Sequence, residues 1–111
     1  MYICNPIKKR HMKLEVFNKY VDNIIDLYRV DKQDLFTNTK RRDIVEPRHL
    51  LYYLCKRRGI SFPYLKIYMN MYGYKINYSS YKNAITYAEN RIAEDEDYLY
   101  VVKKIENSVF I

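Results

Sequence analysis

The side chains best suited to recognition chemistry in this 111-residue chain open a predicted helix that follows residue 76. Asn77 is a suitable N-cap, and small polar or basic groups then recur on one face at three- and four-residue steps: Ser79, Ser80, Lys82 and Asn83. An amide can pair with adenine through two hydrogen bonds, and a serine hydroxyl can bind either a base or a phosphate. Small polar residues at the start of a helix therefore favour close contact with nucleic acid.

Positive charge is concentrated in the middle of the chain. Residues 40–82 contain ten Lys and Arg but only two acidic residues, and they carry the whole excess behind the net charge of +7. The densest cluster is Lys40, Arg41 and Arg42, in a predicted loop. Such an uneven distribution predicts a positive surface that faces a polyanion. A solvated basic face without a partner is the alternative that charge alone leaves open.

Residues typical of catalysis and metal binding are sparse. His11 and His49 are far apart and have no Cys or carboxylate at ligand spacing, so both are interpreted as surface histidines. The adjacent carboxylates at residues 95–97 point in different directions, and we expect them to cap the last helix rather than to act as an acid and a base. Two glycines cannot form a phosphate-binding loop. We therefore expect no enzyme, and no metal, cofactor or small-molecule substrate.

Composition predicts one globular domain over residues 1–111, since 49% of the chain is hydrophobic. No apolar run approaches the roughly 20 residues of a membrane span. The N-terminal basic residues come after a very short apolar stretch, whereas in a secretory signal they precede the apolar stretch. Cys4 and Cys55 are expected to be reduced thiols. These features predict a cytoplasmic protein without a membrane partner. The abundance of Tyr, Lys, Asn and Ile fits AT-rich coding, as in a phage or mobile element, for which the compartment is the host cytoplasm.

Helical periodicity dominates the sequence and predicts an all-α fold. A long first helix is expected over residues 8–29, with an apolar stripe that faces the core, and a single helical turn at residues 32–36. A basic loop is predicted at residues 37–46. After it, Pro47 suits the first turn of a second helix, which should stop at Gly59.

Residues 61–93 form a predicted helix-turn-helix. Ser61 can cap its first helix, Pro63 lies in the first turn, and Gly73 ends this helix before the next one begins at Asn77. In such a unit the second helix lies in the DNA major groove, with its N-terminal residues at the base edges. A last helix is expected over residues 97–108, which completes a small bundle of about five helices.

The middle of the chain also resembles a known family. The segment "KRRDIVEPRHLLYYLCKRRGISFPYL", followed by "NYSSYKNAI", is similar to the C-terminal DNA-binding domain of the bacterial replication initiator DnaA. In that family a basic loop precedes a helix opened by Pro-Arg, then a helix that begins near Leu-Pro, then an Asp-His-Thr-Thr motif that opens the recognition helix. The similarity runs from about Val21 to Ile105 and implies a helical bundle of the Trp-repressor and DnaA C-terminal type. Nothing in the chain resembles the initiator's ATPase module.

The resemblance implies roles for the matching residues that precede the recognition helix. Lys40, Arg41 and Arg42 match the basic loop, from which an arginine of the family enters the minor groove. Arg48 matches an arginine that contacts DNA. Phe62 matches the opening of the third helix, where backbone amides can also hold phosphates.

The Asn-Tyr-Ser-Ser sequence at residues 77–80 takes the place of the family's major-groove motif. Within it, Tyr78 can instead cover the core. Lys82 and Asn83 lie on the same face, and Lys82 is expected on a phosphate. The methyl groups with which Thr contacts thymine are lost, so the resemblance implies a target site that need not be the initiator's own.

Charge, helical pattern and resemblance together predict a sequence-specific, duplex-DNA-binding protein that acts in replication initiation or transcription control. The alternative is a protein-protein adaptor or virion component, which would use the basic face on an acidic protein and keep the fold only as a scaffold. A homodimer or another protein partner stays open in both cases.

Overall fold

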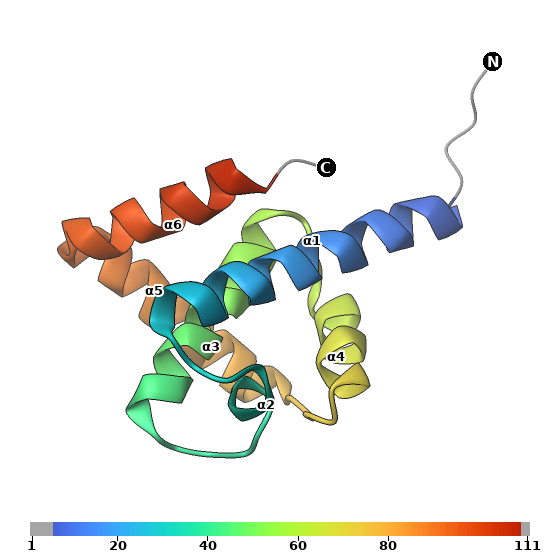
Figure 1. Ribbon diagram of the computed structural model, residues 1–111, viewed down its shortest axis with the longest axis horizontal. Helices are drawn as coiled ribbons and strands as arrows, with labels where there is room; N and C mark the ends of the chain where they lie inside the picture. Colours follow the sequence, from blue (N-terminus) through green and yellow to red (C-terminus); the bar gives the residue numbers. More distant parts are fainter. Residues whose placement is uncertain (1–5, 110–111) are drawn as a thin grey trace.

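The computed structural model describes the backbone of residues 6–109 and the side chains of residues 13–109. This part of the chain contains six helices and no strand, so the predicted all-α class is confirmed (Figure 1). Five long helices were expected, and the sixth, α2, is the single predicted turn after the first helix. The helices are α1 (Pro6–Tyr28), α2 (Lys32–Leu35), α3 (Arg42–Arg57), α4 (Phe62–Met71), α5 (Tyr78–Glu94) and α6 (Glu96–Ser108).

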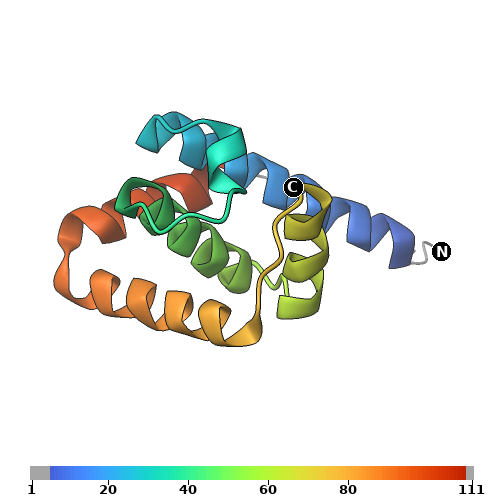
Figure 2. The ribbon, with the colours of Figure 1, turned by 90° about the horizontal axis from the view of Figure 1, so that it is seen from below.

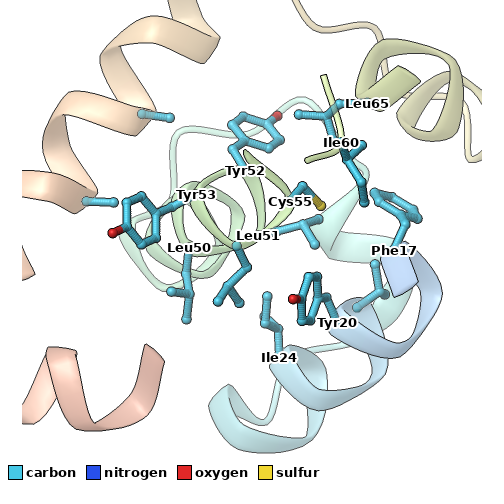
Figure 3. Close-up of a cluster of buried hydrophobic side chains, with 14 of the residues drawn as sticks. Phe17, Tyr20, Ile24, Leu50, Leu51, Tyr52, Tyr53, Cys55, Ile60 and Leu65 are labelled. Carbon is cyan, nitrogen blue, oxygen red and sulfur yellow. The ribbon is translucent and has the colours of Figure 1, made fainter. Parts of the chain in front are cut away.

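The core is built around α3, which lies between α1 on one side and α5 on the other (Figure 2). Large α3 side chains point outward in several directions, and Leu51 and Leu54 are fully buried (Figure 3). On the α5 side, Ala84 and Ala88 are also fully buried. Because these side chains are small, α5 can lie close along α3. One helix therefore supports both the long N-terminal helix and the predicted recognition helix.

The start of α3 differs from the prediction. The helix begins at Arg42, so residues 42–46 belong to it and not to the basic loop, and Pro47 lies one turn further in than expected. Its first turn forms because the Arg41 carbonyl accepts hydrogen bonds from the amides of residues 44 and 45. Burial of Ile44, which is only 1% exposed, favours this longer helix. The loop before α3 is therefore short, at residues 36–41.

Gly59 and Gly73 end α3 and α4 as predicted, and both have φ of +85°. After Gly73, the Tyr74 amide donates a hydrogen bond to the Met69 carbonyl at 3.1 Å, which turns the chain back across the end of α4. The same pattern follows Gly59, where the Ile60 amide bonds the carbonyl of residue 55 at 2.9 Å. Each glycine thus fixes the direction in which the next segment leaves.

Two helices and a turn occupy residues 61–93, in the predicted order. However, α5 packs chiefly along α3, and α4 contacts α1 through the rings of Phe17 and Tyr68, whose centroids are 5.4 Å apart. α4 and α5 meet near their N-termini, where the Phe62 ring lies 5.3 Å from that of Tyr78. The order is present, but a helix-turn-helix unit is not established by this packing. Ser61 occupies the N-cap position of α4 without a side-chain capping bond.

Of the three acidic residues predicted to cap the last helix, Asp95 is its N-cap, whereas Glu96 and Asp97 lie in the first turn of α6. The Asp95 carboxylate accepts hydrogen bonds from the amides of Asp97 and Tyr98 at 3.0 and 3.3 Å. Its other oxygen accepts from Arg91, and this bond, together with the two amides, holds the pKa of Asp95 below its usual range. None of the helices in residues 6–109 combines the length and the apolarity needed to cross a bilayer.

Candidate nucleic-acid interface

The outer face of α5 is free of other elements. Ser79, Lys82 and Asn83 are exposed, whereas the neighbouring Tyr81 and Ala84 are buried on the side that packs along α3. Figure 2 shows α5 along one edge of the molecule, with no helix outside it. The three- and four-residue steps of the sequence therefore place the polar residues on solvent, where a ligand the size of a DNA duplex could reach them.

Asn77 is the N-cap of α5, as predicted. Its side-chain oxygen accepts a hydrogen bond of 2.8 Å from the Ser80 amide. An asparagine that pairs with adenine uses this same oxygen as an acceptor, so the cap and the predicted base contact compete for it. We therefore assign Asn77 to fixing the start of the helix. The other predicted polar residues of the first two turns are all exposed: Ser79, Ser80, Lys82 and Asn83.

Aromatic rings surround the start of α5. Tyr78 is 56% exposed, so it does not cover the core, which was the alternative for this residue. Its ring meets Phe62 edge-on at 5.3 Å, and the Lys82 ammonium lies 5.9 Å from its centroid. Phe62 is half-buried, and its ring also lies 5.0 Å from that of Tyr81. The predicted site residues Phe62, Tyr78 and Lys82 are thus brought together in one cluster.

A groove of about 420 Å³ separates the loop before α3 from the turn before α5. Both of these segments lie on the face that Figure 2 turns toward the reader. The lining residues come from the two segments and from the first turn of α5: Phe36, Asn38, Gly73, Tyr74, Lys75, Ile76, Asn77 and Ser80. The structure therefore joins the loop and the start of α5, predicted as separate contacts, into one continuous surface.

The basic loop is less positive than its sequence indicates. The Arg41 guanidinium binds both oxygens of Asp43, at 3.2 and 2.7 Å, and Arg42 donates to Glu46 at 3.3 Å. The hydrogen bonds from Arg41 lower the pKa of Asp43, and those to Asp43 raise the pKa of Arg41. By contrast, Lys40 takes part in none of the ion pairs among residues 13–109.

Lys75, at the edge of the groove, is likewise outside every ion pair of the described side chains. It is exposed, as are Lys40 and Lys82. The unpaired positive charge of this face therefore comes mainly from lysines. To contact a phosphate, Arg41 would have to exchange its bonds to Asp43 for bonds to DNA.

Arg48 does not lie where the resemblance implies. It is only 5% exposed, and its guanidinium donates to the carbonyls of Leu35 at 3.0 Å and Thr37 at 2.6 Å. A third bond, of 3.2 Å, joins it to the Tyr74 hydroxyl, and the Tyr74 ring lies 4.4 Å from its central carbon. The predicted DNA contact of Arg48 is therefore wrong for this structure. Since α3 starts before Pro47, Arg48 lies inside the helix on its buried face.

One sequence signal was compatible with this placement. Arg48 is spaced by four residues from Ile44 and by three from Leu51, and both of those residues are buried. A position within such a stripe normally faces the core. The stripe alone does not predict burial of Arg48, because a charged residue is seldom buried unless it has partners.

His49 is not the simple surface histidine that was expected. Its ring is half-buried and meets Tyr87 edge-on at 5.0 Å, and its Nδ1 is enclosed without a hydrogen-bond partner among the described residues. Burial, followed by the positive charge of Arg48, lowers the pKa of His49, whereas Glu46 acts in the opposite direction. Nearby, one oxygen of Glu46 accepts bonds from Tyr87 and Arg91, a network that the sequence did not indicate.

This histidine predicts a pH dependence of stability. Because folding lowers the His49 pKa below its ordinary value of about 6.5, the unfolded chain binds the proton more readily, and the free energy of unfolding should fall as the pH drops below that value. Urea denaturation of the wild type and of His49→Gln between pH 7.5 and 5 measures the effect. We expect a smaller slope for His49→Gln over this range. Equal slopes would contradict the assignment.

Metal-binding and reactive groups do not gather at this surface. Within the part of the chain that the structure describes, no three His, Cys, Asp or Glu side chains are grouped so that they could hold a metal ion. Cys55 is fully buried, and burial raises the pKa of its thiol. Cys4 and the His11 side chain lie outside the described residues.

Comparison with known proteins assigns no family to the chain. No family model matches it, and no curated protein and no solved structure does so either. The resemblance to the DnaA C-terminal domain therefore rests on the residue pattern alone. The function has to be argued from the surface that the chain itself presents.

Proposed function

We propose that this protein binds duplex DNA, with α5 in the major groove and residues 36–41 on the neighbouring backbone or minor groove. The observation that carries the proposal is the continuous surface formed by the loop before α3, Lys75 and the first turns of α5. Two segments that lie far apart in sequence there present amide, hydroxyl and ammonium groups on one face. Such groups supply most protein contacts to phosphates and base edges.

The size of α5 suits this role. An α-helix with its side chains is about 10–12 Å across, close to the width of roughly 12 Å of the major groove. Ser79 and Asn83 are exposed and one turn apart, so both can face the same groove. The serines are small enough for the helix backbone to approach the bases, while the exposed Lys82 can reach a phosphate.

Electrostatic attraction would come first from the unpaired lysines. Lys40, Lys75 and Lys82 lie on the loop, the turn and α5, so their charges are spread across the proposed interface. Arg41 and Arg42 add to it only by exchanging Asp43 and Glu46 for phosphates. This exchange is feasible because solvent-exposed ion pairs contribute little to stability.

The biological role that we propose, replication initiation or transcription control, follows from the resemblance to the initiator's DNA-binding domain. A protein-binding role is favoured by a different observation. Ile67 and Met71, one turn apart on α4, are 57% and 62% exposed. Exposed apolar side chains of this kind suit a protein partner or a second copy of the chain.

Selection from random duplex DNA, followed by affinity measurements across a salt series, tests the proposal. We expect an enriched sequence, and we expect log K to fall against log salt with a slope near −5, if about six phosphates are neutralised. The measurement is the affinity for the selected duplex across the salt series. No enrichment together with a flat salt dependence would overturn DNA binding and favour the protein-binding role.

A further inference from the structure

We infer that Arg48 is a positioning residue, which holds the loop at residues 36–41 against the turn before α5 so that the DNA-binding surface is formed before DNA arrives. This inference rests on the proposed function. It assigns Arg48 a role beneath the interface, without contact to DNA. The observation on which it rests is that one buried guanidinium bonds the backbone beside the loop, at Leu35 and Thr37, and the Tyr74 side chain of the turn at the same time.

The three nitrogens of the guanidinium reach three different points. Nε donates to the Leu35 carbonyl and Nη2 to the Thr37 carbonyl, both on the loop side, at 3.0 and 2.6 Å. Nη1 donates at 3.2 Å to the Tyr74 hydroxyl on the opposite side. Because the guanidinium is planar and rigid, fixing one of these contacts restricts the others. Arg48 thereby couples α2, the loop and the turn before α5 to α3.

The charge of Arg48 is an unusual feature of this site. None of the ion pairs among residues 13–109 includes it, although it is only 5% exposed. Its partners are two carbonyl oxygens, a hydroxyl and the face of the Tyr74 ring. A buried charge without a carboxylate is costly, and apolar residues of similar size usually pack as well or better. An arginine here is therefore better explained by the positions that it imposes than by stability.

Neighbouring contacts also hold the loop against the turn before α5. The Phe36 ring, where the loop begins, stacks on Tyr72 at 4.3 Å with an interplanar angle of 13°. The Gly73 turn then directs Tyr74 back across the end of α4, toward Arg48. The stacked rings of Phe36 and Tyr72 and the Arg48 guanidinium thus hold together the same two segments, the loop and the turn before α5. Binding by a surface that is already ordered avoids the cost of ordering it on contact with DNA.

Amide hydrogen exchange of the free protein tests, without any DNA, whether Arg48 orders the loop. The amides of Phe36 and Thr37, which bond carbonyls of α2, and that of Arg41, which bonds the Thr39 hydroxyl, report on the loop. In Arg48→Met we expect them to exchange about tenfold faster or more, with the buried α5 amides unchanged. Arg48→Lys should behave like Arg48→Met, since an ammonium keeps the charge but cannot span three acceptors.

A matched control is Arg57→Met, which removes a charge from the same helix at an exposed site that pairs with Glu106. We expect wild-type exchange of the loop in this variant. If the loop of Arg48→Met exchanges like that of Arg57→Met, the inference is overturned. If Arg48→Met does not fold, Tyr74→Phe removes only the hydroxyl acceptor, and unchanged exchange in this variant together with unchanged DNA selectivity would also overturn it.

DNA binding supplies a second readout. If Arg48 only positions the loop, its replacement leaves the number of neutralised phosphates nearly unchanged, so the salt slope of Arg48→Met should match that of the wild type. The preference of this variant for the selected duplex over random DNA should fall about tenfold. A direct phosphate contact would instead reduce the slope by about one, which would contradict the inference. If the wild type binds no DNA, the proposed function fails, but the exchange experiment still decides the role of Arg48.

Discussion

Replacing Phe17 with Ala is expected to lower the free energy of unfolding by about 3–5 kcal/mol, a large part of the total for a domain of this size. The Phe17 side chain is fully buried, and its ring lies 5.4 Å from Tyr68, 6.3 Å from Tyr72 and 6.4 Å from Phe36. It therefore joins α1, α4 and the start of the loop before α3 at a single point. Removing the ring leaves a cavity that these separate elements cannot close together.

Urea denaturation with a constant m-value measures this loss. Ile67→Ala is the matched control, because Ile67 is 57% exposed on α4 and its loss should change stability by only about 0.5 kcal/mol or less. Phe17→Leu keeps most of the volume and provides an intermediate variant should the alanine variant be largely unfolded. If Phe17→Ala and Ile67→Ala had equal effects, the junction that we describe would not support the fold.

The second large effect is expected on DNA recognition, where two double variants should separate affinity from selectivity. Changing Ser79 and Asn83 together to Ala should reduce the preference for the selected duplex, since a good contact to a base edge contributes about 1–3 kcal/mol of discrimination. Changing Lys40 and Lys75 together to Ala should weaken binding to every duplex and reduce the salt slope by about two, since each phosphate contact contributes roughly one.

These four side chains are exposed, so neither double variant should destabilise the fold appreciably. Titrations of the selected duplex and of a scrambled duplex, each across a salt series, make the measurement. If both variants lose affinity for the two duplexes by the same factor, the separate roles of the helix and the lysines are wrong. Charge reversal at Lys103, an exposed residue of α6, provides a control for changes in net charge alone.

The fold explains how a short chain can present such a surface. α3 lies between α1 and α5 and packs large buried side chains against both, while α5 contributes the small buried Ala84 and Ala88 (Figure 3). The outer face of α5 is then left for contact with a partner. The loop before α3 is placed beside the start of α5 by contacts that α3 itself supplies, chiefly those of Arg48. Support and positioning thus come from the same helix.

Local interactions were sufficient to determine much of this molecule from sequence. The ends of α3 and α4 follow from Gly59 and Gly73, and the starts of α5 and α6 follow from the caps Asn77 and Asp95. Each of these signals depends on bonds between residues only a few positions apart. The spacing of apolar residues similarly determined which face of α5 is buried. Such features survive in any tertiary arrangement, and they can therefore be predicted without one.

Contacts between distant segments were decided only by the tertiary structure. Whether Arg48 faces solvent or the interior depends on acceptors at residues 35, 37 and 74, which helix placement brings together. The same holds for Glu46, whose partners Tyr87 and Arg91 lie more than 40 positions away. Helical periodicity specifies the face on which a side chain lies but not which carbonyls or hydroxyls will meet it there. The role of Arg48 and the groove beside it could therefore not be predicted from the sequence. The exposed polar face of α5 could be.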